Sequence, residues 1–234
     1  MMTTPIKAIV FDLDGTLIHF KIDFIRARRE AIRILKKYNV PKNLLTIKGS
    51  ILENVSKSRE YFNSNKIYDS QKITQIISEV DYEINKIEYE AALQASHIDG
   101  IEEVLEFVER RGLKQAIFTF NTHRNAEISL QKVNLRKYFD LIVGRDNVEN
   151  MKPHPDHLLS ICKSLDVLPS EIIVIGDSSR DIEAALNVGA KSIAIKNKLY
   201  DVSKIETYQK ADKIIEENDI PLKLLESLKE LLIK

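Results

Sequence analysis

Two aspartates, Asp12 and Asp14, are separated by a single residue and directly follow a short apolar run near the start of the sequence. Gly15 permits a tight turn that can bring Asp14 over the same site as Asp12. In such a pair, one carboxylate can attack phosphorus while the other moves protons. A calcium loop is excluded because Leu17 occupies its glycine position and Asp23 its final glutamate position. Taken alone, the pair also fits a helix-capping turn.

A second group of candidates follows a later apolar run and consists of Thr119, Phe120 and Asn121. A hydroxyl and backbone N–H groups at the end of a strand can hold phosphate oxygens. We therefore identify these three residues as candidates for substrate binding. A lone threonine at such a place is common, so this assignment depends on the other motifs.

A basic candidate, Lys152, stands in a loop that contains Pro153 and Pro155. The prolines fix the loop, and Lys152 can place a positive charge beside a phosphoryl group and a nucleophilic carboxylate. The same residue also fits a solvated lysine ahead of a helix. His154 and His157 suggest a metal pair, but no third ligand accompanies them, and we interpret both as surface histidines at a helix start.

A further acidic motif contains Asp177 and Asp181 and follows the apolar run 172–175. Asp177 can join Asp12 as a hard oxygen ligand for Mg²⁺. Asp181 can orient the waters of the metal or hold Lys152. It also fits an ordinary acidic residue in the first turn of a helix.

The elements that must position these residues are short apolar runs rich in isoleucine and valine, which predict strands buried on both faces of a parallel sheet. The predicted strands are 8–11, 115–119, 141–143, 172–175 and 192–195, with a weaker sixth at 213–215. Helical stripes separate them, and Pro155 and Gly189 mark a helix start and a helix end. This alternation predicts an α/β fold with a doubly wound, Rossmann-like parallel sheet. Each motif then lies at the carboxyl end of a separate strand, where one site can collect them all.

The alternation is interrupted between residues 18 and 96, where only helical periodicity is found. A first helix should end near residues 39–41, and a long helix should run from 69 or 70 to about 95. Asp23 and Asp69 are expected to cap these helices. Apolar residues in the long helix alternate steps of four and three, which indicates either packing inside a helical bundle or a dimer contact. The domain prediction is a core of residues 1–18 and 97–234 with a helical insert at 19–96.

The bulk composition narrows the class of protein. Basic and acidic residues number 35 each, so the net charge of zero predicts neither a nucleic acid nor a membrane surface as partner. Cys162 is the single cysteine, and we find neither a signal peptide nor a membrane-length apolar run. We expect a cytoplasmic protein.

With the motifs combined, the sequence resembles the haloacid dehalogenase (HAD) superfamily, in the branch similar to phosphoglycolate phosphatases. The segment 12–17 matches the first motif of that superfamily, and 176–181 matches the fourth. Thr119 fits the second motif and Lys152 the third. The helical insert is similar to a C1-type cap domain.

The resemblance implies a role for each candidate residue. Asp12 is the nucleophile that becomes an aspartyl phosphate, and Asp14 protonates the leaving alcohol and then activates water. Mg²⁺ is held by Asp12, the main-chain carbonyl of Asp14, and Asp177. Thr119 and Lys152 bind the phosphoryl group.

The implied activity is Mg²⁺-dependent hydrolysis of a small phosphorylated metabolite by a monomer or homodimer. The alternatives are a sugar-phosphate mutase similar to β-phosphoglucomutase and a regulatory binding protein without activity. His19 stands where many such phosphatases carry an aspartate, which leaves phosphoglycolate itself open as the substrate. Asp14 argues against carbon–halogen hydrolysis, because dehalogenases lack this acid. The choice of substrate must come from the helical insert, where basic residues near its start and at a turn are either substrate contacts or a solvated face. They are Lys21, Arg26, Arg28, Arg29 and Lys48, with Ser50 beside them.

Overall fold

The computed structural model describes residues 5–19, 21–198 and 201–233. The chain divides into two compact units. Met1–Phe20 and Ala92–Lys234 form the first, which we call the core unit, and Lys21–Ala91 form the second, which we call the helical unit.

A six-stranded sheet organises the core unit, and every neighbouring pair of strands in it is parallel. Its strands are β1 Ala8–Phe11, β2 Lys114–Phe118, β3 Leu141–Val143, β4 Ile172–Gly176, β5 Lys191–Lys196 and β6 Lys213–Glu216. The strand order is β3-β2-β1-β4-β5-β6. The chain therefore winds outward in both directions from the pair β1 and β4, which is the point where such sheets bind ligands. All six predicted strands are confirmed, the weak sixth included.

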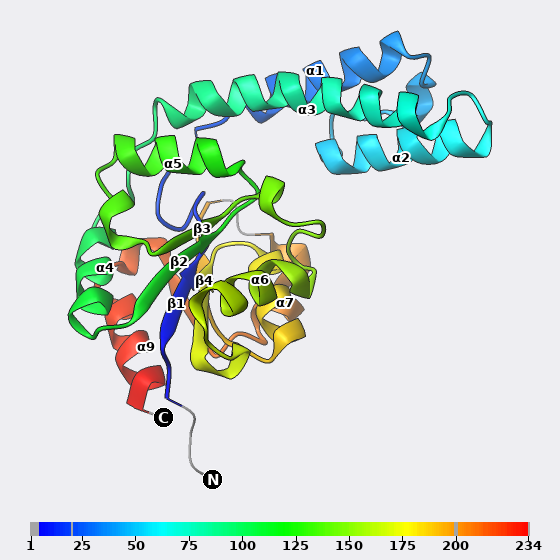
Figure 1. Ribbon diagram of the computed structural model, residues 1–234. Helices are drawn as coiled ribbons and strands as arrows, with labels where there is room; N and C mark the ends of the chain where they lie inside the picture. The colour runs from blue at the N-terminus through cyan, green and yellow to red at the C-terminus, as the bar shows by residue number, and fades with distance from the viewer. Residues whose placement is uncertain (1–4, 20, 199–200, 234) are drawn as a thin grey trace. The chain divides into compact units, whose positions relative to one another are not determined.

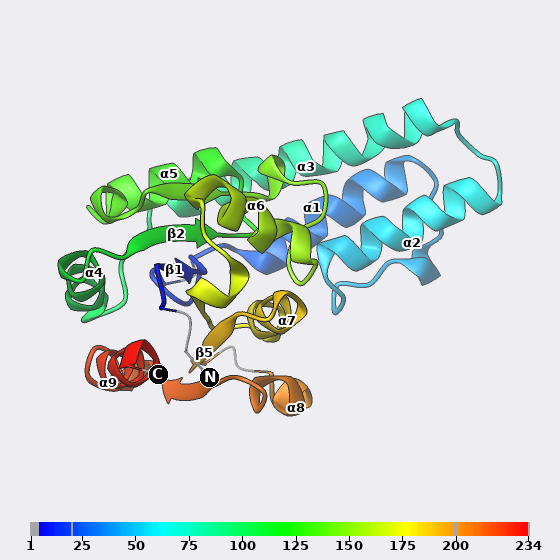
Figure 2. The ribbon, with the colours of Figure 1, turned by 60° about the horizontal axis from the view of Figure 1, so that its bottom comes forward.

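Helices cover both faces of this sheet (Figures 1 and 2). They are α4 Ile101–Arg110, α5 His123–Lys132, α6 Pro155–Leu165, α7 Ser179–Val188, α8 Ile205–Tyr208 and α9 Leu222–Ile233. Because neighbouring residues of a strand face opposite ways, Ile9 and Phe11 pack with α4, α5 and α9, whereas Ala8 and Val10 pack with α6 and α7. The prediction of a doubly wound α/β fold is confirmed.

The helical unit contains α1 Phe24–Lys37, α2 Ile51–Ser64 and α3 Ser70–Ala92, which lie alongside one another (Figures 1 and 2). The predicted caps are confirmed, since the Asp23 carboxylate accepts a hydrogen bond from the Arg26 amide and Asp69 from the Lys72 amide. Ile73, Val80 and other seam residues of α3 pack into one apolar cluster with α1 and α2. This favours the bundle interpretation of the seam.

Two features of the helical unit differ from expectation. Phe24, whose spacing from Ala31 and Leu35 predicts a place on the same face of α1, is 38% exposed, and the Arg28 guanidinium lies 5.8 Å from its ring centroid. The helix α2 was not predicted as a separate element. None of the helices in the described residues is both long and apolar enough to cross a membrane.

Candidate active site

The turn after β1 brings Asp12 and Asp14 to the carboxyl edge of the sheet. The Asp12 amide donates to the carbonyl of Ile175 in β4 at 2.8 Å, which continues the strand pairing up to the site. Gly15 has a φ of +84°, and a Cβ at this position would lie 2.4 Å from Asp177 Oδ2. Only glycine therefore satisfies both the left-handed turn and the close approach of Asp177.

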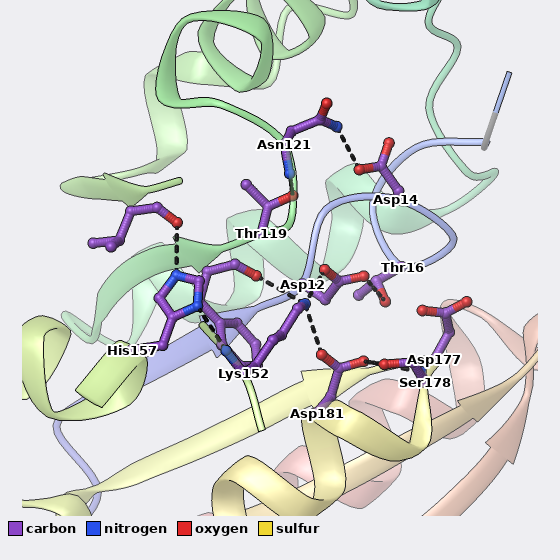
Figure 3. Close-up of polar contacts among 12 residues, drawn as sticks. Asp12, Asp14, Thr16, Thr119, Asn121, Lys152, His157, Asp177, Ser178 and Asp181 are labelled. Carbon is purple, nitrogen blue, oxygen red and sulfur yellow. Dashed lines mark hydrogen bonds and ion pairs between the residues drawn. The ribbon is translucent and has the colours of Figure 1, made fainter. Parts of the chain in front are cut away.

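Lys152 forms the centre of a buried charge network in the core unit (Figure 3). Its Nζ donates to Asp12 Oδ1 at 2.5 Å, to Asp181 Oδ1 at 2.7 Å and to the Phe118 carbonyl at 3.1 Å. An ammonium has three N–H donors, so all of them are used. Burial alone would lower the pKa of Lys152, but the charges of Asp12 and Asp181 outweigh it and raise the pKa. Lys152 is therefore a fixed positive charge.

The Asp12 carboxylate is 5% exposed and its two oxygens have different surroundings. Oδ1 accepts from Lys152, whereas Oδ2 accepts a long hydrogen bond from the Thr16 hydroxyl at 3.5 Å. Burial, with the charge of Asp181 adding to it, raises the pKa of Asp12 to about 6, and Lys152 limits the rise. One oxygen of Asp12 thus stays available for chemistry while the other fixes its orientation.

Asp177 directly follows β4, Asp181 lies in the first turn of α7, and the two carboxylates have different partners. Both oxygens of Asp181 are occupied, Oδ1 by Lys152 and Oδ2 by the amide and hydroxyl of Ser178 at 2.9 and 2.6 Å. Asp177 Oδ2 accepts from Asn197 Nδ2 at 2.6 Å, and its Oδ1 accepts no hydrogen bond within the described chain. Asn197, which follows β5, was not predicted as a site residue. Burial and the charges of Asp12 and Asp181 raise the pKa of Asp177 to about 8.

These carboxylates fit a divalent cation. One oxygen from each of Asp12, Asp177 and Asp181 lies within 4.8 Å of the others. Three buried carboxylates face one ammonium, and this excess of negative charge adds to burial in raising the pKa of Asp177. Hard oxygen ligands of this kind suit Mg²⁺, and Asp12 and Asp177 each have an oxygen to offer. Asp181 is the poorer ligand because both of its oxygens already accept hydrogen bonds.

The loop after β2 brings the predicted phosphate-binding residues to the same edge. Thr119 is fully buried, its amide donates to the Val143 carbonyl at 3.1 Å, and its Oγ1 accepts from the Asn121 amide at 3.0 Å. Among the residues that the structure describes, the Thr119 hydroxyl donates to none, so its proton can be offered to a ligand. Asn121 Nδ2 donates to Asp14 Oδ2 at 2.6 Å, which ties the second aspartate of the first motif to this loop (Figure 3).

The Phe120 ring contacts two cationic side chains. Lys152 Nζ is 5.1 Å from the ring centroid, and the Arg180 guanidinium carbon is 5.4 Å from it. Arg145 Nη1 donates to the Phe120 carbonyl at 2.8 Å and so fixes the loop from outside. The Phe120 carbonyl therefore binds Arg145, whereas the Phe120 ring contacts Lys152 and Arg180.

The two histidines after Lys152 have different environments, and the expectation for one was wrong. His154 is exposed, and its ring accepts from the Asp156 amide at the start of α6. His157 is fully buried rather than on the surface, and both of its ring nitrogens have partners. Its spacing from Ile161 and Leu165, one helical turn and two, was the signal that placed it on the buried face.

Comparison with known proteins decides the family. A sequence model described as haloacid dehalogenase-like hydrolase matches residues 9–195, a range that contains every candidate site residue named above except Asn197. The chain belongs to this family. The predicted superfamily and its hydrolase class are confirmed. Members of the haloacid dehalogenase-like family generally use a divalent metal, which agrees with the aspartate cluster at the end of β1 and β4.

Relatives within the family carry phosphatase names. A protein named pyrophosphatase PpaX from Bacillus cereus (strain B4264) is 28% identical over 206 residues, or 87% of this chain and 89% of the relative. An N-acetylmuramic acid 6-phosphate phosphatase from Pseudomonas aeruginosa is 28% identical over 196 residues, 84% of each chain. The solved structure of a β-phosphoglucomutase from Clostridium difficile has a TM-score of 0.67, with 22% identity over 98% of this chain and 100% of that chain. That likeness concerns the fold.

Proposed function

We propose that the protein is a Mg²⁺-dependent phosphatase that hydrolyses a small phosphate monoester through an aspartyl phosphate on Asp12. The observation that carries the proposal is the buried hydrogen bond from Lys152 to Asp12. It lies at the carboxyl end of β1 and β4, the strand pair from which the chain winds outward in both directions. It supplies an ionised carboxylate held in one orientation, with a positive charge beside it. Relatives named as phosphatases support the same reaction class.

Each proposed step uses a group at this edge of the sheet. An oxygen of Asp12 attacks phosphorus, the bond from phosphorus to the ester oxygen breaks, and Asp14 gives its proton to the leaving alkoxide. Asp14 then takes a proton from water, whose oxygen attacks the phosphorus of the aspartyl phosphate and releases inorganic phosphate and free Asp12. Lys152 and the Thr119 hydroxyl stabilise the charge on the phosphoryl oxygens in both steps.

Asp12, Asp177 and the main-chain carbonyl of Asp14 would hold the Mg²⁺. When bound, the ion neutralises charge on the carboxylates and on the phosphoryl oxygens. We assign Asp181 to Lys152 rather than to the ion, because its oxygens accept from Lys152 and Ser178.

The helical unit, Lys21–Ala91, is proposed to be the C1-type cap that selects the leaving group. The partner is then a small phosphorylated metabolite, and the protein acts as a monomer or homodimer. Cys162 is free and buried, so no cystine is required, in keeping with a cytoplasmic enzyme.

A screen of phosphorylated metabolites for phosphate release, with and without EDTA, tests the proposal. Release that EDTA abolishes and added Mg²⁺ restores is the expected result. Undiminished release in EDTA would refute the metal assignment, and no release from any phosphate ester would refute the activity. Sugar phosphates belong in the screen, because an isomerised sugar phosphate in place of free phosphate would identify the mutase alternative.

A further inference from the structure

We propose that His157 is a positioning residue that holds the main chain of Lys152 against the end of β3 and thereby sets the place of the Lys152 ammonium. This inference rests on the proposed phosphatase function. His157 lies in the first turn of α6 and belongs to none of the four motifs that carry the family resemblance.

The bonds of His157 fix its tautomer. The Lys152 amide donates to Nδ1 at 3.3 Å, so Nδ1 is the unprotonated nitrogen. The proton then resides on Nε2, which donates to the Val143 carbonyl at 3.0 Å. Both contacts are visible in Figure 3. A single neutral ring therefore bridges the loop that carries Lys152 and the last residue of β3.

The bridge also reaches the phosphate-binding loop. The Val143 carbonyl that accepts from His157 accepts from the Thr119 amide too, at 3.1 Å. Through this one oxygen, His157 relates the main chain of Lys152 to that of Thr119. The two groups proposed to bind the phosphoryl oxygens, the Lys152 ammonium and the Thr119 hydroxyl, are thus kept in register by His157. The His157 ring bonds to main-chain groups and not to that ammonium or hydroxyl.

The surroundings keep the bridge in one form. His157 is fully buried, and the Phe118 ring meets it edge to face with centroids 5.6 Å apart. Burial lowers the pKa of His157 to about 4, with the charge of Lys152 adding to the effect and the Val143 carbonyl and Asp181 opposing it. The ring stays neutral near pH 7, and a second ring proton would face the N–H of Lys152.

Misplacement of Lys152 has a direct chemical consequence. Its three N–H groups are already divided among Asp12, Asp181 and the Phe118 carbonyl. A shift of the main chain therefore lengthens at least one of these bonds and turns Asp12 from its orientation. Errors of about 1 Å in a catalytic group reduce rates by about a hundredfold.

Two substitutions separate the two bonds of His157. In His157→Asn, the amide oxygen takes the place of Nδ1 and still accepts from the Lys152 amide, but the donor to Val143 is lost. In His157→Gln, the longer side chain still reaches the Val143 carbonyl with its NH₂ group, but the acceptor for Lys152 is lost. Both substitutions remove the ring and its contact with Phe118, so both should lower the thermal midpoint to a similar extent.

The experiment measures kcat, KM and the thermal midpoint of wild type and both variants on one substrate from the screen, with Mg²⁺ present. We expect kcat to fall about tenfold or more in His157→Gln and about threefold or less in His157→Asn, at similar midpoints. Equal losses of kcat in the two variants would overturn the inference. If the wild type releases no phosphate, the proposed function fails instead, and the two failures are distinguishable.

A third variant, His157→Leu, covers the case in which Asn and Gln do not fold. Leucine fills the apolar site and offers neither bond. A folded His157→Leu protein should lose kcat at least as much as His157→Gln. Wild-type kcat in His157→Leu would overturn the inference.

Discussion

The active-site edge of the core unit and the surface of the helical unit use charged residues in opposite ways. At the carboxyl edge of the sheet, Lys152, Asp12 and Asp181 are 3%, 5% and 0% exposed, and Lys152 forms an ion pair with each of the two carboxylates. In the helical unit, ion pairs such as Arg26 with Glu90 join exposed side chains on the helix surfaces. Buried pairs are costly to break and hold a single geometry, whereas exposed pairs contribute little to stability.

This difference separates the chemistry from the selection of substrate. If one charged residue of the buried network is replaced by an uncharged one, a buried charge is left without its partner. The helical unit is held by its apolar cluster, which includes Ala31, Phe62 and Val80, so its surface charges can change without loss of fold. We therefore expect the reaction to depend on the core unit and the range of substrates to depend on the helical unit.

The largest expected effect is on activity and comes from Asp12→Asn. The amide keeps the shape of the side chain but cannot form the aspartyl phosphate, so turnover should fall by roughly a thousandfold or more. Measured phosphate release under saturating substrate and Mg²⁺ checks this. Retention of a tenth of wild-type turnover would contradict covalent catalysis by Asp12.

Lys152→Met should be the most destabilising change in the charge network. It leaves Asp12 and Asp181 buried without their cation, and loss of one member of a buried pair costs about 3–5 kcal/mol in the free energy of unfolding. Urea denaturation measures this, and turnover should fall as well. An unchanged denaturation midpoint would show that the network does not hold the site together.

Gly15→Ala tests the close approach of Asp177 to the turn. The strained backbone should lower the free energy of unfolding by about 1–3 kcal/mol. The new Cβ would also displace Asp177, so the Mg²⁺ concentration needed for half-maximal activity should rise.

Gly112→Ala is the matched control for this substitution. Gly112 has a φ of +66°, but a Cβ there meets nothing within 4 Å. It shares the backbone strain and should leave the Mg²⁺ dependence unchanged. An equal change in Mg²⁺ dependence in the two variants would contradict the role given to the turn.

The smallest expected effect is that of Glu90→Gln in the helical unit. The carboxylate is exposed and paired with Arg26 at the surface, so neither the denaturation midpoint nor turnover of a small aromatic phosphate should change measurably. A loss of stability comparable to that of Lys152→Met would remove the contrast between the two units.

The sequence predicted those parts of the structure that depend on local patterns. Alternating strands and helices were recognisable from apolar runs and stripes, and every motif that followed a strand reached the same edge of the sheet. Asp12, Lys152 and Asp181 were placed in one site because parallel strands end together. The tight turn at Gly15 was also predictable, because glycine readily adopts a left-handed backbone conformation.

Contacts between distant segments were not predictable in this way. Asn197 donates a hydrogen bond to Asp177, which lies 20 residues earlier in the sequence. An asparagine after a strand belongs to no sequence pattern from which its hydrogen-bond partner can be predicted. His157 was misread because a polar residue in the first turn of a helix is usually solvated, and its buried role depends on the Val143 carbonyl opposite it. The helix α2 was missed because its exposed and buried residues do not form a clear apolar stripe.

The central claim is that Asp12 carries the phosphoryl group, and peptide mapping of an Asp14→Asn protein tests it most directly. This variant is mixed with p-nitrophenyl phosphate and Mg²⁺, quenched in acid and digested. Its leaving group needs no proton, but water is not activated, so the phosphorylated enzyme should accumulate. We predict a phosphate on the peptide that contains Asp12. A phosphate on any other residue, or wild-type turnover by Asp14→Asn, would contradict the mechanism.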